Sequence, residues 1–171
     1  MNESIKNLLE RRSIRAYKKE LVPKETLDTI LEAGEYSPSG MGQSTLMVVT
    51  QDPELVARLS KMNAAVMGST SDPFYGAPTV IIVFSNSKMG TCVENGSLVM
   101  GNLMNAAHAL GVDSCWIHRA REVFDSEEGK ELKKQWGVPE EYIGVGHCVL
   151  GYRDCEYPTA KPRKDGFVIR V

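Results

Sequence analysis

A short arginine-rich segment near the start of the chain carries its strongest chemical signal. Residues 11–15 read Arg-Arg-Ser-Ile-Arg and follow a helical pattern formed by Ile5, Leu8 and Leu9. Guanidinium groups bind phosphate oxygens through paired hydrogen bonds, and a serine hydroxyl adds a further donor. The segment therefore predicts a specific anion site. A solvated helix end, where cations favour the helix dipole, is the alternative.

Two further segments could reach the same anion. A loop rich in Gly, Ser and Pro covers residues 37–43, and Arg163 with Lys164 forms a cationic pair near the end of the chain. One phosphate-bearing ligand held from both ends of the chain would explain all three features. The sequence has no GxGxxG, no GxxxxGK(S/T) and no GxSxG motif, which disfavours the usual dinucleotide, NTPase and serine-hydrolase classes.

The cysteines suggest neither a metal site nor a disulfide framework. Cys92, Cys115, Cys148 and Cys155 form no CxxC pair. Cys115 and His118 are three positions apart, and on a strand such residues point to opposite faces. We therefore expect reduced thiols and no bound metal.

Length and charge limit the classes of function. The chain has 171 residues, a formal net charge of −2 and a hydrophobic fraction of 42%. These values favour one globular domain over residues 1–171 and disfavour binding to nucleic acid or to a membrane surface. The first residues lack the apolar run of a signal peptide, and no apolar stretch reaches the ~20 residues of a bilayer span, so we expect a cytoplasmic protein.

The hydrophobic pattern predicts an α+β fold with helices around one sheet. The predicted helices cover residues 3–11, 23–33, a stretch from 53, 93–110 and 125–136. The predicted strands cover residues 46–50, 79–84, 113–118, 143–152 and 167–171. The 93–110 helix is apolar almost all round, which is typical of a helix in a protein centre or an interface.

In the order and spacing of several segments, the chain resembles the FMN-dependent nitroreductase family. These segments are residues 11–15, 37–43, 95–110, 111–119 and 144–151. The resemblance implies a mixed, mostly antiparallel sheet flanked by helices. It also implies an intertwined homodimer with FMN at the interface, in which a C-terminal arm beginning near Pro158 crosses to the partner.

The resemblance also implies three groups of FMN-binding residues. Contacts to the phosphate, the ribityl chain and the pyrimidine edge would come from Arg11, Arg12, Ser13, Arg15, Arg163 and Lys164. The isoalloxazine ring would be lined from the partner subunit by Pro38, Ser39, Gly40 and Gln43. Backbone groups on the other side of the ring, including an N–H toward flavin N5, would come from Cys115, Trp116, Ile117 and His118.

The implied activity is that of an NAD(P)H oxidoreductase in which the cofactor carries the chemistry and no side chain is catalytic. NAD(P)H would reduce FMN and leave, and a nitroaromatic, a quinone or a similar electron-poor acceptor would take its place in a ping-pong cycle. Arg15 would stabilise the negative charge of the reduced flavin. Two alternatives stay open: a flavin-binding redox sensor or FMN store without efficient turnover, and a non-flavin domain that binds another phosphorylated ligand.

Overall fold

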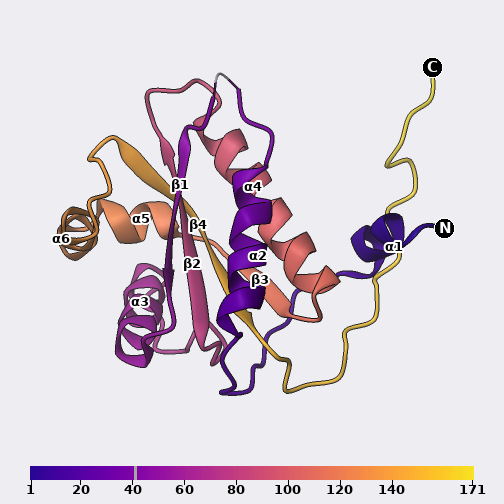
Figure 1. Ribbon diagram of the computed structural model, residues 1–171, viewed down its shortest axis with the longest axis horizontal. Coiled ribbons are helices and arrows are strands. Elements are labelled where there is room, and N and C mark those ends of the chain that lie inside the picture. Colours follow the sequence, from indigo (N-terminus) through magenta and orange to yellow (C-terminus); the bar gives the residue numbers. More distant parts are fainter. Residues whose placement is uncertain (41) are drawn as a thin grey trace.

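A four-stranded antiparallel sheet lies at the centre of the molecule, in the order β1-β2-β4-β3 (Figure 1). Its strands are β1 (Thr45–Thr50), β2 (Thr79–Asn86), β3 (Asp113–Ile117) and β4 (Tyr142–Gly151). The computed structural model describes residues 1–40 and 42–171. An isolated parallel bridge between Ser13 and Ser114 adds a parallel element beside β3. The predicted α+β class, with a mostly antiparallel sheet flanked by helices, is confirmed.

Helices cover both faces of this sheet (Figure 1). They are α1 (Glu3–Glu10), α2 (Lys24–Glu35), α3 (Pro53–Val66), α4 (Cys92–Ala109), α5 (Ala120–Asp125) and α6 (Glu127–Gln135). One apolar core contains residues of α2 and α4, and the other contains residues of α3, α5 and α6. The short α1 stands at one side of the molecule against the end of α4 (Figure 1).

Strand β2 contributes side chains to both apolar cores, which explains its uninterrupted apolar sequence. Successive side chains of a strand point to opposite faces. Ile81 and Val83 enter the core under α2 and α4, whereas Val80 and Ile82 enter the core under α3 and α5. A strand covered on both faces has no solvent side, so alternation of polar and apolar residues is lost.

Helix α4 packs tightly on the sheet near its beginning. A Cβ atom added at Gly96 would lie 2.5 Å from Val145 Cγ2, so only glycine allows this approach to β4. Gly101, by contrast, has open space around it. The helix ends as predicted at a glycine in the left-handed region, since Gly111 has φ 74°.

The predicted 125–136 helix is wrong at its start. Asp125 ends a separate short helix, α5, that the pattern did not predict, and Ser126 is the N-cap of α6. The Ser126 hydroxyl accepts a hydrogen bond from the Gly129 N–H (3.1 Å), which a cap residue provides for an otherwise unpaired amide. Ser126 itself is extended, and this breaks the two helices apart.

The predicted strand at residues 167–171 is also wrong for the single chain. From residue 154 onward the chain is exposed and contains no strand among the described residues. Figure 1 shows this C-terminal arm leaving the sheet, passing α1 and ending away from the body of the molecule. An apolar alternation forms a strand only when another strand supplies hydrogen-bond partners, and none lies beside this run. Exchange of the arm between subunits stays a prediction.

Candidate functional site

The arginine segment, residues 11–15, lies alongside the edge strand β3. The Ile14 N–H donates to the Ser114 carbonyl (3.1 Å), and Ser13 bridges the same residue in parallel orientation. Ile14 is fully buried and anchors the segment in the core. The chain therefore folds here as a short addition to the sheet edge, with the polar residues of the segment close to Cys115.

Two guanidinium donors of this segment are buried and have no acceptor. Arg11 Nη1 and Arg12 Nε form no hydrogen bond with any described residue. Arg12 Nη1 donates to the carbonyls of Leu9 (2.7 Å) and Arg11 (2.8 Å), while Arg15 is exposed. A buried charged donor without a partner costs at least about 1–3 kcal/mol, so this arrangement is typical of a site that an anion completes.

The end of β3 brings the second predicted group to the same place. Cys115 and Ile117 are buried, Trp116 is half-buried, and His118 follows the strand and is exposed. Because the arginine segment runs parallel to β3, Arg15 lies nearest the end of the strand. The single chain thus brings residues 11–15 of the first predicted group beside the predicted backbone group.

The third predicted group lies elsewhere in the chain. Its members are Pro38, Ser39, Gly40 and Gln43, and residue 41 between them is outside the described residues. The Gly40 N–H donates to Asn95 Oδ1 (3.3 Å), and Asn95 Nδ2 donates to Ser44 Oγ (2.8 Å). Asn95 stands in the first turn of α4, so this loop is attached to the beginning of that helix.

Helix α4 separates the loop from the arginine segment. The end of α4 contacts α1, where Asn7 Nδ2 donates to the Asn105 carbonyl (2.9 Å), and α1 leads directly into residues 11–15. Asn95 and Asn105 stand about 15 Å apart along the helix axis at ~1.5 Å per residue. One chain therefore keeps the two predicted half-sites of an FMN pocket, residues 11–15 with β3 and the loop at 37–43, at opposite ends of α4.

No hydrogen bond or ion pair joins the cationic pair near the C-terminus to the arginine segment or to the loop among the described residues. Arg163 and Lys164 are exposed, and neither forms an ion pair with a described residue. They lie on the arm that leaves the sheet beside α1 (Figure 1). Their place at a phosphate site stays a prediction that requires the arm to be arranged by a partner.

The cysteines near the arginine segment are not activated. Burial raises the pKa of the Cys115 thiol, although Arg15 and the Ser13 hydroxyl oppose this effect. Burial also raises the pKa of Cys148 to about 12. Because the thiolate is the nucleophile, both cysteines are unreactive at neutral pH.

Other classes of site lack support in the described part of the chain. No group of three or more His, Cys, Asp or Glu residues is arranged to hold a metal ion there. No helix among the described residues combines the length and apolar character that a membrane crossing requires. The arginine segment, with its two buried donors that lack an acceptor, is the candidate site among the described residues.

Comparison with known proteins identifies the family. The model of the nitroreductase family matches residues 8–70 and 64–152. The chain belongs to the nitroreductase family. A relative from Archaeoglobus fulgidus, provisionally named NADH dehydrogenase/NAD(P)H nitroreductase, is 31% identical over 159 residues, which cover 89% of this chain and 86% of the relative.

Solved structures of nitroreductases have the same fold as this family member. A nitroreductase with bound FMN from Bacteroides fragilis superposes with a TM-score of 0.92 at 29% identity, and the match covers 100% of both chains. A nitroreductase with bound FMN from Desulfitobacterium hafniense superposes with a TM-score of 0.88 at 27% identity, again over 100% of both chains. The predicted family is therefore confirmed.

Sequence reasoning missed a buried polar cluster behind the end of β3 in this nitroreductase-family chain. Asn63 donates to the His118 carbonyl (2.7 Å) and accepts from Arg119 Nε (3.2 Å). Arg119 has φ 73°, in the left-handed region that residues other than glycine rarely adopt. His147 Nδ1 lies 3.5 Å from the same amide nitrogen. The available signal was Asn63 itself, a polar residue one turn after the buried Leu59 on the inward face of α3.

Proposed function

We propose that this chain is an FMN-dependent NAD(P)H oxidoreductase that reduces nitroaromatics, quinones or similar electron-poor acceptors. The observation that carries the proposal is the pair of buried donors, Arg11 Nη1 and Arg12 Nε, that lack an acceptor beside β3. A phosphate monoester supplies both the negative charge and the acceptor oxygens that these donors need. FMN-bound nitroreductases of the same fold support the choice of ligand.

The residues of one chain would divide the binding of FMN between them. Arg11, Arg12 and Ser13 would bind the phosphate and the ribityl chain, and Arg15 would place a positive charge near the pyrimidine edge. The backbone of residues 115–118 would contact the isoalloxazine ring. A rigid strand orients a ring better than a loop does, and β3 is held by its pairing with β4.

Bound FMN would supply hydride transfer from NAD(P)H to the acceptor in two successive half-reactions. The protein would contribute binding, orientation and charge, and no side chain is needed as a nucleophile. The protonated thiols of Cys115 and Cys148 agree with this division of roles.

The second half-site would come from another copy of the chain. We propose a homodimer in which Pro38, Ser39, Gly40 and Gln43 of one subunit reach the flavin bound beside β3 of the other. Apolar side chains left exposed on the surface of the single chain support this arrangement; on α1 and α4 they are Ile5, Leu8, Leu9, Val93 and Leu98. Gly101, with open space around it, would permit close approach of a partner helix.

Absorption spectroscopy tests the proposal directly. Purified protein reconstituted with FMN should show the flavin band in the blue, and this band should bleach rapidly on anaerobic addition of NADH or NADPH. Addition of a nitroaromatic or a quinone should then restore it. A bound flavin that neither nucleotide bleaches would instead indicate an FMN store or sensor, and a protein that binds no flavin would refute both functions.

A further inference from the structure

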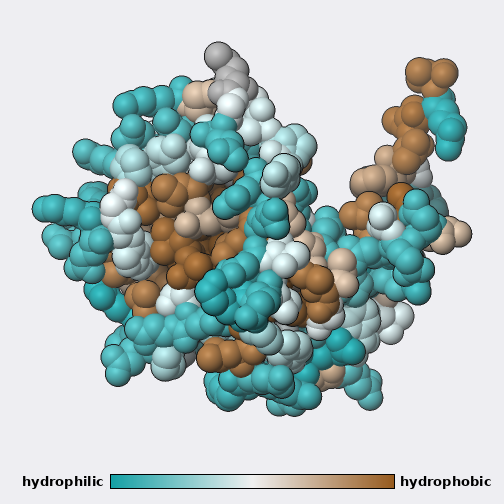
Figure 2. Space-filling model, viewed as in Figure 1, coloured by the Kyte–Doolittle hydropathy of each residue, from teal (hydrophilic) through white to brown (hydrophobic). Residues whose placement is uncertain are grey.

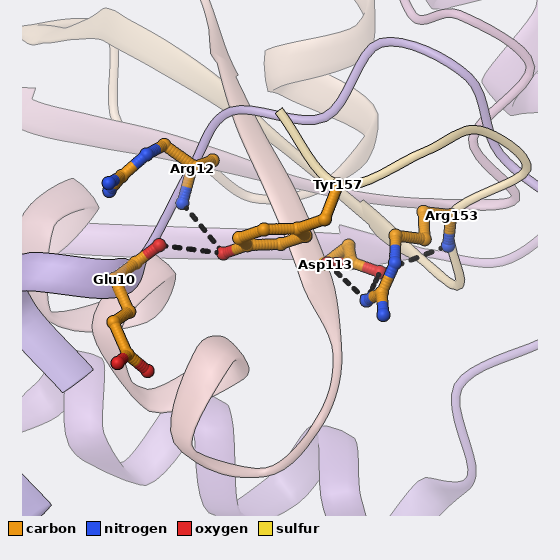
Figure 3. A network of polar contacts seen from close by, with 5 residues as sticks. All are labelled: Glu10, Arg12, Asp113, Arg153 and Tyr157. Carbon is orange, nitrogen blue, oxygen red and sulfur yellow. Dashed lines mark hydrogen bonds and ion pairs between the residues drawn. The ribbon is translucent and has the colours of Figure 1, made fainter. Parts of the chain in front are cut away.

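Tyr157, at the base of the C-terminal arm, joins the arm to the arginine segment (Figure 3). Its hydroxyl accepts a hydrogen bond from the Arg12 N–H (3.1 Å) and donates one to the Glu10 carbonyl (2.9 Å). Carbonyl groups at the C-terminal end of a helix lack partners within the helix, and Glu10 is the last residue of α1. One hydroxyl therefore ties together both sides of the turn that leads from α1 into the arginines.

The ring of Tyr157 is held by elements of the rigid body. It stacks on His108 in the last turn of α4, with ring centroids 6.1 Å apart and planes 14° apart. The Arg153 guanidinium carbon lies 5.0 Å from the ring centroid. Arg153 in turn binds the buried carboxylate of Asp113 at the start of β3, through its N–H (3.0 Å) and Nη1 (3.2 Å). These contacts with α4 and with Arg153, which is bound to β3, thus fix the position of the Tyr157 hydroxyl.

This contact acts on the backbone from which the orphan donors project. Arg11 and Arg12 follow Glu10 directly, so the dihedral angles at this turn decide where their guanidinium groups point. The Arg12 guanidinium is already drawn back to the Leu9 carbonyl (2.7 Å). A small rotation of the turn would change the directions in which Arg11 Nη1 and Arg12 Nε point.

We propose that Tyr157 is a positioning residue that sets the direction in which Arg11 and Arg12 present their buried donors to the phosphate of FMN. This inference rests on the proposed function. Tyr157 then affects the affinity for FMN without contacting the flavin ring. Its signature is therefore specific for the phosphate: a loss in binding of FMN without an equal loss in binding of riboflavin, which lacks the phosphate.

The test compares Tyr157→Phe with the wild type by titration of FMN and of riboflavin, followed by quenching of flavin fluorescence. The variant keeps the stacked ring and removes only the hydroxyl. Loss of hydrogen bonds of ordinary strength predicts a Kd for FMN raised about threefold to tenfold, with the Kd for riboflavin changed less than about twofold. Tyr142→Phe is the matched control, because the Tyr142 hydroxyl makes no hydrogen bond with a described residue and stands at the far end of β4.

Each result of these titrations either supports or overturns the role of Tyr157. Unchanged affinity of Tyr157→Phe for FMN would overturn the inference and leave the proposed function intact. Equal weakening of FMN and riboflavin would also overturn it, since the hydroxyl would then serve folding alone; thermal unfolding of each variant records that role separately. A wild-type chain that binds FMN no better than riboflavin would refute the phosphate site, and the inference with it.

Discussion

Arg11 and Lys18 are cations of the same N-terminal stretch, yet only Arg11 has a buried donor without a partner. A charge-assisted hydrogen bond to a phosphate contributes ~1.5–3 kcal/mol. Arg11→Ala should therefore raise the Kd for FMN about tenfold or more, while Lys18→Ala should leave it unchanged. Fluorescence titration measures both. Wild-type affinity in the Arg11→Ala variant would contradict the assignment of this side chain to the phosphate.

His147 should make stability depend on pH. Burial, opposed by a backbone hydrogen bond and assisted by the Arg119 charge, lowers the pKa of this fully buried imidazole to about 3. In the unfolded chain the imidazole takes up a proton below its ordinary pKa of about 6.5. The unfolded state then binds more protons than the folded state, so the free energy of unfolding falls as the pH drops through this window, by up to about 1.4 kcal/mol per pH unit.

Substitution of His147 isolates this contribution. His147→Gln removes the titrating group. When the pH is lowered from 7 to 5, the free energy of unfolding of the wild type should therefore fall by about 2 kcal/mol more than that of the variant. Urea unfolding at both pH values and at one protein concentration measures the difference. A difference that stays constant with pH would mean that His147 titrates alike in the folded and the unfolded protein, which would contradict the lowered pKa.

At the scale of elements, a glycine in α4 allows the close contact between this helix and β4. A Cβ atom at position 96 would lie 2.5 Å from Val145 Cγ2, whereas one at Gly90 would meet nothing within 4 Å. Gly96→Ala should therefore lower the free energy of unfolding by about 1–3 kcal/mol through overpacking. Gly90→Ala should change it by less than about 0.5 kcal/mol. Denaturant unfolding of the two variants would contradict this packing if both had equal stability.

The elements also show where sequence patterns succeed. The predicted strands at 46–50, 79–84 and 143–152 match β1, β2 and β4 closely, because a short apolar run is a local signal in the sequence. The boundary between α5 and α6 was missed, because Asp125 and Ser126 are both good cap residues and only their backbone angles distinguish them. Residues 37–40, 42 and 43 of the predicted loop lie outside helices and strands as expected, but the attachment of Gly40 to Asn95 depends on a contact 55 positions away.

At the scale of the whole molecule, the end of the C-terminal arm stands out because its apolar side chains are exposed. Phe167, Val168 and Ile169 are exposed by 82%, 69% and 84%, and Figure 2 shows this apolar end of the arm standing away from the body. Among the described residues, strand β1 pairs with β2 alone, and no strand pairs with its other edge. Exposed strand edges and apolar runs favour pairing with another chain. A second copy that receives the arm would cover both.

Deletion of residues 167–171 tests this arrangement. The full chain should sediment as a dimer, and the shortened chain should dissociate at concentrations where the full chain does not. The shortened chain should also bind FMN more weakly, because each flavin would lose the loop at 37–43 of the partner. Arg170→Ala keeps the apolar side chains and should keep the dimer. A full chain that sediments as a monomer, or a shortened chain with undiminished dimer stability, would contradict the exchange of arms.

The sequence by itself determined the family, the class of fold and most of the helices and strands, because periodicity and motif spacing are properties of neighbouring residues. It also predicted an anion site at residues 11–15. Only the tertiary structure decided which arginine donors are buried without a partner and that α4 keeps the loop at 37–43 apart from them. It alone revealed the hydrogen bond between Arg12 and Tyr157, which are 145 positions apart, and the cluster around Asn63. Such contacts depend on how packed elements meet in space, and no local pattern encodes that geometry.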